Sequence, residues 1–414
     1  MGHRLDIVHQ GDTVLLSSAS TVLLTAPADD VDGLFEYAMD FCDEDQGHIR
    51  LSSGRYVLKR PIRVDKSVTF EGAGYATKLI PPAGEFAVDV RVTARSPLRR
   101  DIIRDATTWL YNMENRTHGI VMHNLCIDGE GRGKGLSVEF LMEGVFSNLF
   151  IHRTRDGAGL RLGPSVMETT FRDVHLLDCG TRREAAVSLE SQPGGDACNN
   201  VTFQSVYIIF PNGTGLEVGA GKGAEKPRLI TLRDCMIHGW LPWQKTAKGP
   251  LLKISALDPV RGLRMFGGRV TCAHVEFPYV RLIEGAAKFH AVSFGGGGAN
   301  TAISTQPGTH IVVRDCDFHG SRAANRRGDI AHIAGDFEFD ANTCEPDCGR
   351  LVFNESARGF VSHNRFLKTA EGRPLILRHG DAAKNVAVEG NLFSCKRDQD
   401  DANAAQSDTS SSGE

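Results

Sequence analysis

Short apolar runs separated by very short polar breaks dominate the chain. Between residues 46 and 73, an alternating run at 48–51 is followed by a Ser-Ser-Gly turn and by apolar runs at 56–58, 62–64 and 68–70. Runs of this length suit β-strands, but the breaks are too short for a helix that crosses between parallel strands. The pattern predicts a chain that forms short strands and turns a corner after each one.

A six-residue unit recurs from residue 122 onward. Its first and sixth positions are apolar, its third is small or polar, and its fourth is usually apolar. Most successive units are 24 to 32 residues apart, and a wider gap before residue 361 predicts a further unit at FEFDANT, 337–343. The others read MHNLCI at 122–127, FSNLFI at 146–151, FRDVHL at 171–176, FQSVYI at 203–208, LRDCMI at 232–237, CAHVEF at 272–277, FHAVSF at 289–294, VRDCDF at 313–318, VSHNRF at 361–366 and VEGNLF at 388–393.

A second strand keeps step with this unit. Each repeat is too small to bury its own apolar side chains, so the repeats must stack on one another. The sequence therefore predicts a solenoid of β-strands. The second strand reads GLSVE at 135–139, GLRLG at 159–163, AVSLE at 186–190, GLEVG at 215–219, LLKIS at 251–255, YVRLI at 279–283, IAHIA at 330–334, RLVFN at 350–354 and PLILR at 374–378.

Residues 29–45, DDVDGLFEYAMDFCDED, predict an amphipathic helix. Asp29 or Asp30 has a side chain suited to cap its amino end. Apolar residues recur at helical spacing and would form one buried face. They are Val31, Leu34, Phe35, Ala38, Met39 and Cys42.

The helix, the strand pair at 49–58, the strand VTFEGAG at 68–74 and the turn LCIDGEGRG at 125–133 resemble the pectin-lyase-like superfamily of right-handed parallel β-helix proteins. The resemblance extends over about residues 29–395. It implies an all-β, single-stranded right-handed parallel β-helix (a solenoid) of roughly ten to twelve coils with an N-terminal capping helix. Residues 1–28 would be an N-terminal extension. Residues 396–414, poor in apolar side chains, predict a disordered acidic, Ser-rich tail.

The resemblance implies a fold rather than an activity. Polygalacturonase-like members carry Asn-Thr-Asp and Gly-His-Gly on successive coils, and this chain has neither sequence. Its Asp-Asp pairs, at 29–30 and 400–401, lie outside the predicted coils. Function must therefore be sought in the side chains of this sequence.

Charge and hydropathy exclude some classes of partner. A net charge of −4 and a pI near 6.4 do not suit a protein that holds nucleic acid by bulk electrostatics. No run approaches the roughly 20 apolar residues of a membrane span. Residues 13–26 lack a positive run ahead of an apolar core, so we expect no signal peptide. A cytoplasmic, particle-associated or non-classically exported protein is expected.

The fourth position of the unit predicts an inward column. Cys235 and Cys316 share it with leucines and valines, so we expect them to pack as small apolar residues. Asn364 and Asn391 would hydrogen-bond along the stack, because a buried amide needs partners. Cys344 and Cys348 are close enough to pair, or with Cys395 to hold a metal, but zinc-site spacing is absent. We expect no metal and no cofactor.

The outward face of the second strand carries the candidate chemistry, because alternate side chains of a strand point out. Glu190, Glu217 and Lys253 are the candidate catalytic residues. Such a face could hold an extended sugar chain through charged and aromatic contacts. Candidate substrate-binding residues are Arg161, Arg281, Glu139, Trp240 and Trp243. The first outward row consists of Ser137, Arg161, Ser188, Glu217, Lys253, Arg281 and His332. The second row, two residues farther along each strand, consists of Glu139, Gly163, Glu190, Gly219 and Ser255.

Two chemistries fit these residues. Glu190 and Glu217 would lie on adjacent coils, offset by two residues, with backbones about 8 Å apart, which suits an inverting glycosidase. A lyase would need a base and a cation, which Lys253, Arg161 and Arg281 could supply. A polysaccharide-active hydrolase or lyase is the first expectation. The alternative is a non-catalytic glycan-binding or spike-like β-helix, and either a monomer or a homotrimer fits the sequence.

Overall fold

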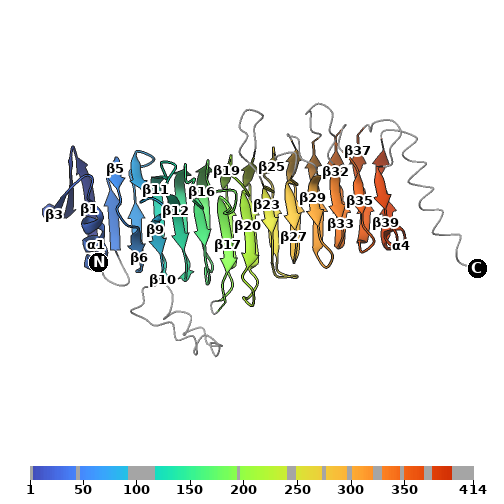
Figure 1. The fold of residues 1–414 in the computed structure, drawn as a ribbon, viewed down its shortest axis with the longest axis horizontal. Coiled ribbons are helices and arrows are strands. Elements are labelled where there is room, and N and C mark those ends of the chain that lie inside the picture. The colour runs from blue at the N-terminus through green and yellow to red at the C-terminus, as the bar shows by residue number, and fades with distance from the viewer. Residues whose placement is uncertain are drawn as a thin grey trace, which may run out of the picture.

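A computed structural model describes residues 3–42, 47–91, 117–193, 196–239, 249–272, 277–295, 301–319, 329–345, 349–367 and 375–393. Nearly all regular structure in these residues is β-strand, stacked rung upon rung along one long axis (Figure 1). The prediction of an all-β, single-stranded right-handed parallel β-helix with an N-terminal capping helix is confirmed.

One face of the solenoid is a parallel sheet of twelve strands, called sheet B here. Each rung contributes one strand, so the twelve strands agree with the predicted ten to twelve coils. Apolar side chains alternate inward along these strands, as in the buried–exposed–buried pattern of Val280–Leu282. The strands are β6 (Ile62–Val64), β9 (Phe86–Val90), β12 (Lys134–Val138), β15 (Leu160–Leu162), β17 (Val187–Ser191), β20 (Leu216–Ala220), β23 (Leu252–Ile254), β26 (Val280–Leu282), β29 (Thr301–Thr305), β32 (Asp329–Ile333), β35 (Leu351–Phe353) and β38 (Ile376–Arg378).

The remaining rung strands form sheet A, which bends into two columns. Three strands run through both columns: β11 (Val121–Asp128), β14 (Val145–His152) and β16 (Thr170–Leu177). The first column also contains β4 (Gly47–Leu51), β7 (Val68–Glu71), β18 (Asn199–Gln204), β21 (Arg228–Arg233), β24 (Leu263–Phe266), β27 (Ala286–His290), β30 (His310–Arg314), β33 (Asp336–Asp340), β36 (Arg358–Ser362) and β39 (Val386–Glu389). The second contains β5 (Gly54–Val57), β8 (Thr77–Ile80), β19 (Tyr207–Ile209), β22 (Met236–His238), β25 (Arg269–Thr271), β28 (Ser293–Gly295), β31 (Asp317–Phe318), β34 (Thr343–Cys344), β37 (Arg365–Phe366) and β40 (Leu392–Phe393).

The corner between the two columns explains the third position of the six-residue unit. The residue there has a φ between 50° and 61° in ten rungs. This left-handed region is costly for most side chains, and Asn, Asp and Gly tolerate it best. The requirement accounts for the small or polar residue in the pattern. The ten residues are Asn124, Asn148, Asp173, Ser205, Asp234, Ala291, Asp315, Ala341, His363 and Gly390.

The fourth position forms an inward column, as predicted. Cys235 and Cys316 are buried there, and burial raises the pKa of Cys235 to about 11 and that of Cys316 to about 12. Phenylalanine rings stack from rung to rung nearby, with Phe146 and Phe171 centroids 4.8 Å apart and Phe171 and Phe203 centroids 5.3 Å apart. The core is thus a set of like side chains stacked along the axis.

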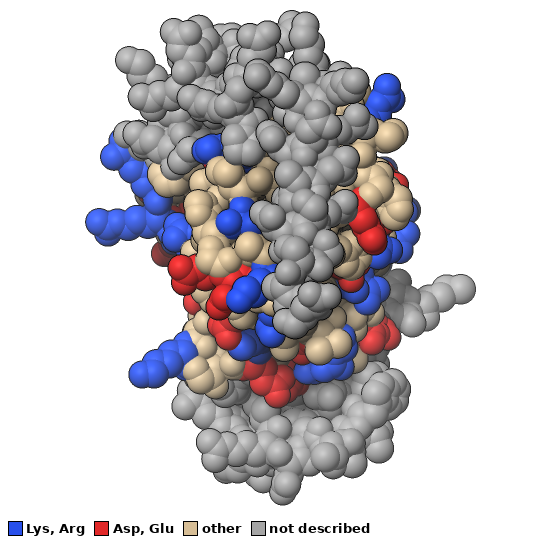
Figure 2. Space-filling model, turned by 90° about the vertical axis from the view of Figure 1, so that its right-hand side faces the viewer, with Lys and Arg blue, Asp and Glu red and all other residues tan. Residues whose placement is uncertain are grey.

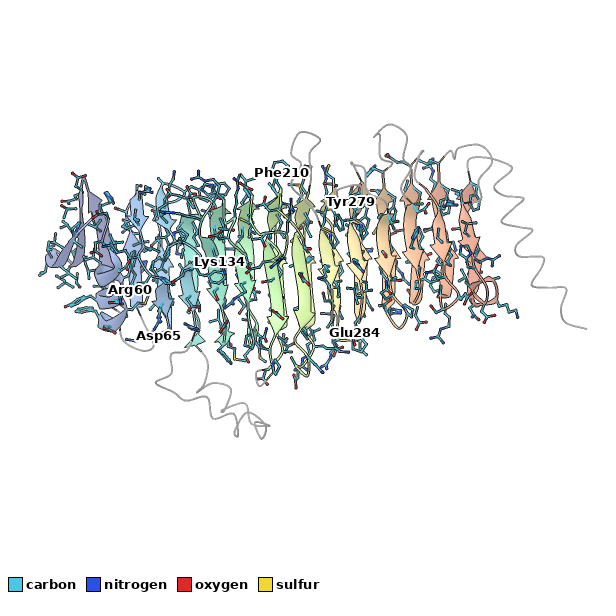
Figure 3. All side chains as sticks on the ribbon, in the orientation of Figure 1. Arg60, Asp65, Lys134, Phe210, Tyr279 and Glu284 are labelled. Atoms are coloured by element: carbon cyan, nitrogen blue, oxygen red, sulfur yellow. The ribbon has the colours of Figure 1, made fainter. Side chains whose placement is uncertain are left out.

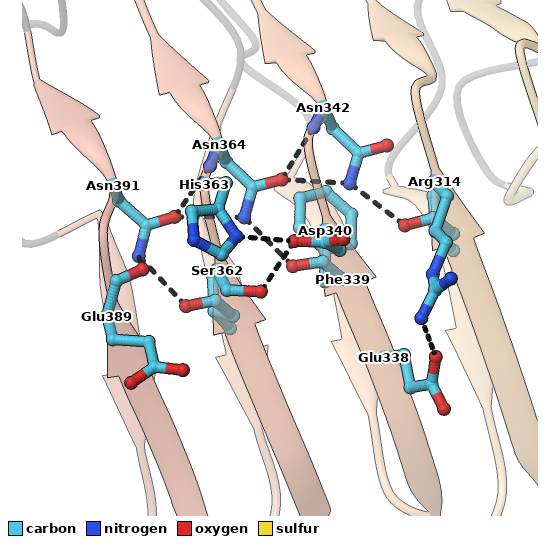
Figure 4. A network of polar contacts seen from close by, with 12 residues as sticks. Arg314, Glu338, Phe339, Asp340, Asn342, Ser362, His363, Asn364, Glu389 and Asn391 are labelled. Atoms are coloured by element: carbon cyan, nitrogen blue, oxygen red, sulfur yellow. Dashed lines mark hydrogen bonds and ion pairs between the residues drawn. The ribbon is translucent and has the colours of Figure 1, made fainter.

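An asparagine ladder continues this column toward the C-terminal end (Figure 4). The Asn342 amide donates to Asn364 Oδ1 and the Asn364 amide donates to Asn391 Oδ1, both at 2.9 Å. Each amide nitrogen also donates to a backbone carbonyl of the preceding rung. The predicted hydrogen bonding of Asn364 and Asn391 is confirmed. FEFDANT does form a rung, β33 and β34, and supplies the third asparagine.

The unit predicted at 272–277 is wrong. The rung that follows β22 is formed instead by β24 and β25, because Met236 pairs with Arg269 and Arg269 pairs with Ser293. Its corner holds Gly267 and Gly268, both with positive φ. Gly268 stands at the fourth position of the unit, where the pattern requires an apolar side chain. The pattern therefore did not recognise this rung. Residues 273–276 lie outside the described residues.

The N-terminal end is closed by α1 (Asp32–Phe41) and by three antiparallel strands, β1 (His3–Gln10), β2 (Thr13–Ser18) and β3 (Thr21–Pro27). β1 pairs parallel with β4, so it extends sheet A by one strand. The six predicted apolar residues of the helix are buried. The predicted cap is wrong: Val31 occupies the N-cap position and no side chain caps the helix. Asp30 instead pairs with Lys59 at 2.7 Å.

Small elements complete the described residues. β10 (Thr117–His118) pairs with β13 (Leu141–Met142), and the short helix α4 (Ala382–Asn385) precedes β39. Neither described helix has both the length and the hydropathy of a membrane span.

Candidate functional site

The outward face of sheet B brings the predicted first row into register. Its paired positions run Ser137, Arg161, Ser188, Glu217, Lys253, Arg281, Ser304 and His332. Ser304 is the one member of this row that the repeat pattern did not predict. In Figure 3, Tyr279 and Glu284 flank β26 at the two edges of this sheet, and Lys134 begins β12 nearer the N-terminal end of the stack.

Glu190 and Glu217 lie on the adjacent strands β17 and β20. Glu190 pairs with Gly219, and Glu217 pairs with Ser188, so the two glutamates are diagonal neighbours offset by two residues. Neighbouring strands are about 4.8 Å apart and two residues span about 6.7 Å, which puts their backbones about 8 Å apart. Glu190 is exposed and accepts no hydrogen bond from another described residue.

Glu217 is held by two donors from the next rung. Lys253 Nζ lies 2.6 Å and Ser255 Oγ 2.9 Å from Glu217 Oε1. Both donors reach the same oxygen, so Oε2 keeps its accepting capacity. Because the side chains of Glu217 and Lys253 are only 27% and 31% exposed, the pair is partly shielded from water and its geometry is well defined.

Arg161 is committed to neighbours within the sheet. Its guanidinium lies 2.6 Å from Glu139 Oε1 and 3.1 Å from Ser137 Oγ, and stands 5.0 Å from the ring centroid of Phe86. A Cβ at Gly163 would lie 2.6 Å from Glu139 Cγ, so the close approach of Glu139 requires glycine there. Arg161 and Glu139 therefore neutralise each other, and the cation–π contact with Phe86 was not visible in the sequence.

The other predicted binding residues have different outcomes. Arg281 is exposed on β26 and has no carboxylate partner within 4 Å among the described residues. Trp240 and Trp243 lie outside the described residues, so their place relative to Lys253 stays a prediction. Cys348 and Cys395 lie outside them as well.

A charged cluster that the sequence did not reveal lies farther along sheet B. Asp329 Oδ2 lies 2.7 Å from His332 Nε2, and Asp329 Oδ1 lies 3.2 Å from Arg350 Nε. Burial opposes ionisation of Asp329, but the hydrogen bonds from His332 and Arg350 outweigh it and lower its pKa to about 2. Only His332 was assigned to this face from the sequence, because its partners come from other positions of the repeat.

Opposite charges alternate over the described surface, as the end-on view shows (Figure 2). On sheet B the pairs Asp89–Arg91, Glu139–Arg161 and Glu217–Lys253 are internal to the face. Within the described ranges, no group of three or more His, Cys, Asp or Glu side chains is placed to hold a metal ion. The arrangement suits a ligand bound by many hydrogen bonds, and it offers Glu190 and Arg281 as uncommitted charges.

The sequence matches no protein-family model and no curated protein. Several solved structures share its fold at low identity, among them the following three. The A-module of the mannuronan C-5 epimerase AlgE4 of Azotobacter vinelandii has a TM-score of 0.54 at 11% identity, over 88% of this chain and 96% of that one. PfbA, a surface adhesin of Streptococcus pneumoniae, has a TM-score of 0.50 at 8% identity, over 82% and 87%.

The third structure is ORF18 of Geobacillus virus E2, with a TM-score of 0.50 at 14% identity over 83% of this chain. This chain spans 58% of the length of that viral protein. Likenesses at these identities show a common architecture. Together with the stacked parallel rungs, they establish that the chain has the right-handed parallel β-helix fold.

Proposed function

We propose that the protein binds a polysaccharide along the outward face of sheet B and cleaves a glycosidic bond there by acid–base chemistry. The diagonal register of Glu190 and Glu217 carries this proposal. Their backbone separation of about 8 Å is compatible with the roughly 6.5–9.5 Å between the carboxyl groups of inverting glycosidases.

The two carboxylates have different surroundings, which suits different roles. Glu217 is oriented by Lys253 and Ser255 and keeps one oxygen available, so it acts as the base. It takes a proton from a water that attacks the anomeric carbon. Glu190, which no other described residue hydrogen-bonds, acts as the acid and gives its proton to the oxygen of the leaving sugar. Both proton transfers balance the hydrolysis of one bond.

The remaining residues of the face supply binding and orientation. Ser188 and Ser304 offer hydroxyls in the first row, and exposed Arg281 lies one rung beyond Lys253. One structural neighbour is named a mannuronan C-5 epimerase, which supports a polysaccharide as the ligand class for this fold. An extended chain that lies along the axis would cross successive rungs of the same sheet.

Non-catalytic glycan binding is the second candidate. The internal pairing of Arg161 with Glu139 and of Lys253 with Glu217 favours it, because paired charges are less available for chemistry. A second neighbour is named a surface adhesin, which is in keeping with such a role. A purely binding protein would retain its ligand and release no product.

Activity against a polysaccharide panel tests the proposal, with reducing ends reporting hydrolysis and ultraviolet absorbance reporting the unsaturated products of a lyase. Glu190→Gln and Glu217→Gln should each reduce the rate about 10²–10⁴-fold, the range for loss of a positioned acid or base. Loss of the Glu217–Lys253 pair should cost about 1 kcal/mol or less of folding free energy.

Glu355→Gln is the matched control, since Glu355 is exposed in the turn after β35, outside the sheet B row. It should keep full activity. If Glu190→Gln and Glu217→Gln unfold at normal denaturant concentrations and also keep full activity, the carboxylate assignment is wrong. Binding of a glycan without any product would favour the second candidate.

A further inference from the structure

We infer that a hollow on the first column of sheet A binds an acidic sugar unit, at a site separate from the sheet B face. The hollow has a volume of about 450 Å³ and lies over β24, β27, β30 and β33. Its lining includes Arg264, Lys288, Arg314 and Phe266. These residues belong to sheet A, whereas Glu190, Glu217 and Lys253 belong to sheet B of the solenoid.

The register places two cations side by side in the hollow. Arg264 on β24 pairs directly with Lys288 on β27, and both side chains are exposed. Neither has a carboxylate within 4 Å among the described residues, in contrast to Arg314, which lies 2.8 Å from Glu338. Two adjacent unneutralised cations repel each other, so an anion bound between them relieves that repulsion.

An aromatic ring adjoins the cations in the neighbouring row. Phe266 is 39% exposed, so part of its ring is open to a ligand in the hollow. The Arg233 guanidinium stands 5.9 Å from its ring centroid and the His290 ring 6.4 Å from it, which fixes the ring in place. His290 in turn lies 3.2 Å from Asp315. The exposed part of Phe266 can therefore pack against a sugar ring whose acidic group reaches Arg264 and Lys288.

A uronate-type or sulfated sugar unit combines these features better than other anions. Inorganic anions would use the cations but gain nothing from Phe266, and neutral sugars would use Phe266 but leave the cations unpaired. Arginine binds planar carboxylates in a bidentate manner, so a uronate carboxylate is the group that Arg264 suits best. A site of this kind would hold an acidic polysaccharide on a second face of the solenoid.

Titration calorimetry with an oligogalacturonate tests the inference, with a neutral galacto-oligosaccharide and inorganic sulfate as comparison ligands. The acidic oligosaccharide should bind more tightly than either, and more weakly as salt rises above about 0.1 M. Arg264→Ala with Lys288→Ala should weaken its binding by about ten-fold or more, because two charge-assisted contacts are lost. Phe266→Ala should weaken it several-fold. A heparin fragment compares sulfate with carboxylate recognition.

Arg172→Ala is the matched control. Arg172 is exposed in the row of sheet A that also contains Arg233 and Phe266, two rungs before Arg233. Its replacement removes one positive charge outside the hollow. It should leave binding unchanged. Equal loss in Arg172→Ala would show diffuse attraction and overturn the inference. Unchanged binding in the folded Arg264→Ala, Lys288→Ala protein would overturn it as well.

Discussion

Asp329 shows how single side chains set the stability of the outer face. Its carboxylate accepts hydrogen bonds from His332, from the Arg350 guanidinium and from the Arg350 backbone amide. These bonds outweigh the cost of burial and bring its pKa to about 2. Asp in an unfolded chain titrates near 3.9. The lower folded-state pKa therefore stabilises the fold fully above about pH 4, and this contribution is lost as the pH falls toward 2.

Asp329→Asn should destabilise the protein by about 1–2 kcal/mol at pH 7, a value that allows for partial solvent screening. The difference from the parent protein should shrink as the pH is lowered from 4 toward 2. Urea unfolding at several pH values measures it. Asp336→Asn is the control, because the Asp336–Arg358 pair is at least half exposed and should change stability by less than about 1 kcal/mol. A difference that persists at pH 2 would contradict the assignment.

The sequence predicted inward residues better than outward contacts. Cys235 and Cys316 could be placed because a column of apolar residues recurs at one position of the repeat. The contact between Arg161 and Phe86 could not, because Phe86 comes from a rung ahead of the first recognised unit. The partners of Asp329 were missed for a similar reason, since they depend on how long side chains reach between rungs.

The asparagine ladder shows what an element of the repeat contributes. Asn364 is fully buried, and its amide donates to Phe339 O and to Asn391 Oδ1 while its Oδ1 accepts from Asn342. A buried amide is tolerated only because every polar atom is paired. The ladder therefore holds three consecutive rungs in one register.

Asn364→Ala should cost about 2–4 kcal/mol, because it leaves buried donors and acceptors in two neighbouring rungs without partners. Asn391→Ala removes the outermost member of the ladder and should cost less than half as much. Denaturant unfolding of the two variants, followed by circular dichroism, gives the comparison. Equal costs would mean that the ladder does not act through its buried hydrogen bonds.

The corner residues mark the limit of pattern recognition at this scale. Ten of the described rungs carry a corner residue with φ between 50° and 61°, and most of these residues could be aligned by eye because Asn, Asp or a small residue recurs there. In the rung of Gly267 and Gly268, two glycines adopt the positive φ of the corner, so no Asn, Asp or apolar side chain marks it in the sequence. This corner has two residues, as does the corner of the preceding rung, but neither of its glycines has the side chain on which an apolar pattern depends.

At the scale of the whole molecule, the ends of the stack need protection. A terminal rung presents unpaired strand edges and apolar side chains, and repeat proteins cover them with atypical elements. Here α1 covers the first rungs, and Phe35 packs 6.1 Å from the rings of Tyr56 and Phe70. The apolar face of this helix was predicted correctly from the sequence. Its N-cap was not, because Asp30 forms an ion pair with Lys59 instead.

Phe35→Ala should destabilise the protein by about 3–5 kcal/mol, because it removes a buried aromatic side chain between the helix and the first rungs. Tyr37→Ala, on the exposed side of the same helix, should change stability by only about 0.5 kcal/mol. Limited proteolysis should cut the Phe35→Ala protein first near its N-terminal end. Equal sensitivity of both variants would show that the helix does not seal the stack.

The stacking of rungs also determines how the molecule would bear a pulling force. β1 and β40 lie at opposite ends of the long axis (Figure 1), and within the described residues each rung strand pairs through its backbone with strands of the rungs beside it. Tension applied between these two ends passes through every rung interface in turn, so the weakest interface sets the strength of the whole. Once that interface opens, the rungs on either side of it would unfold one after another.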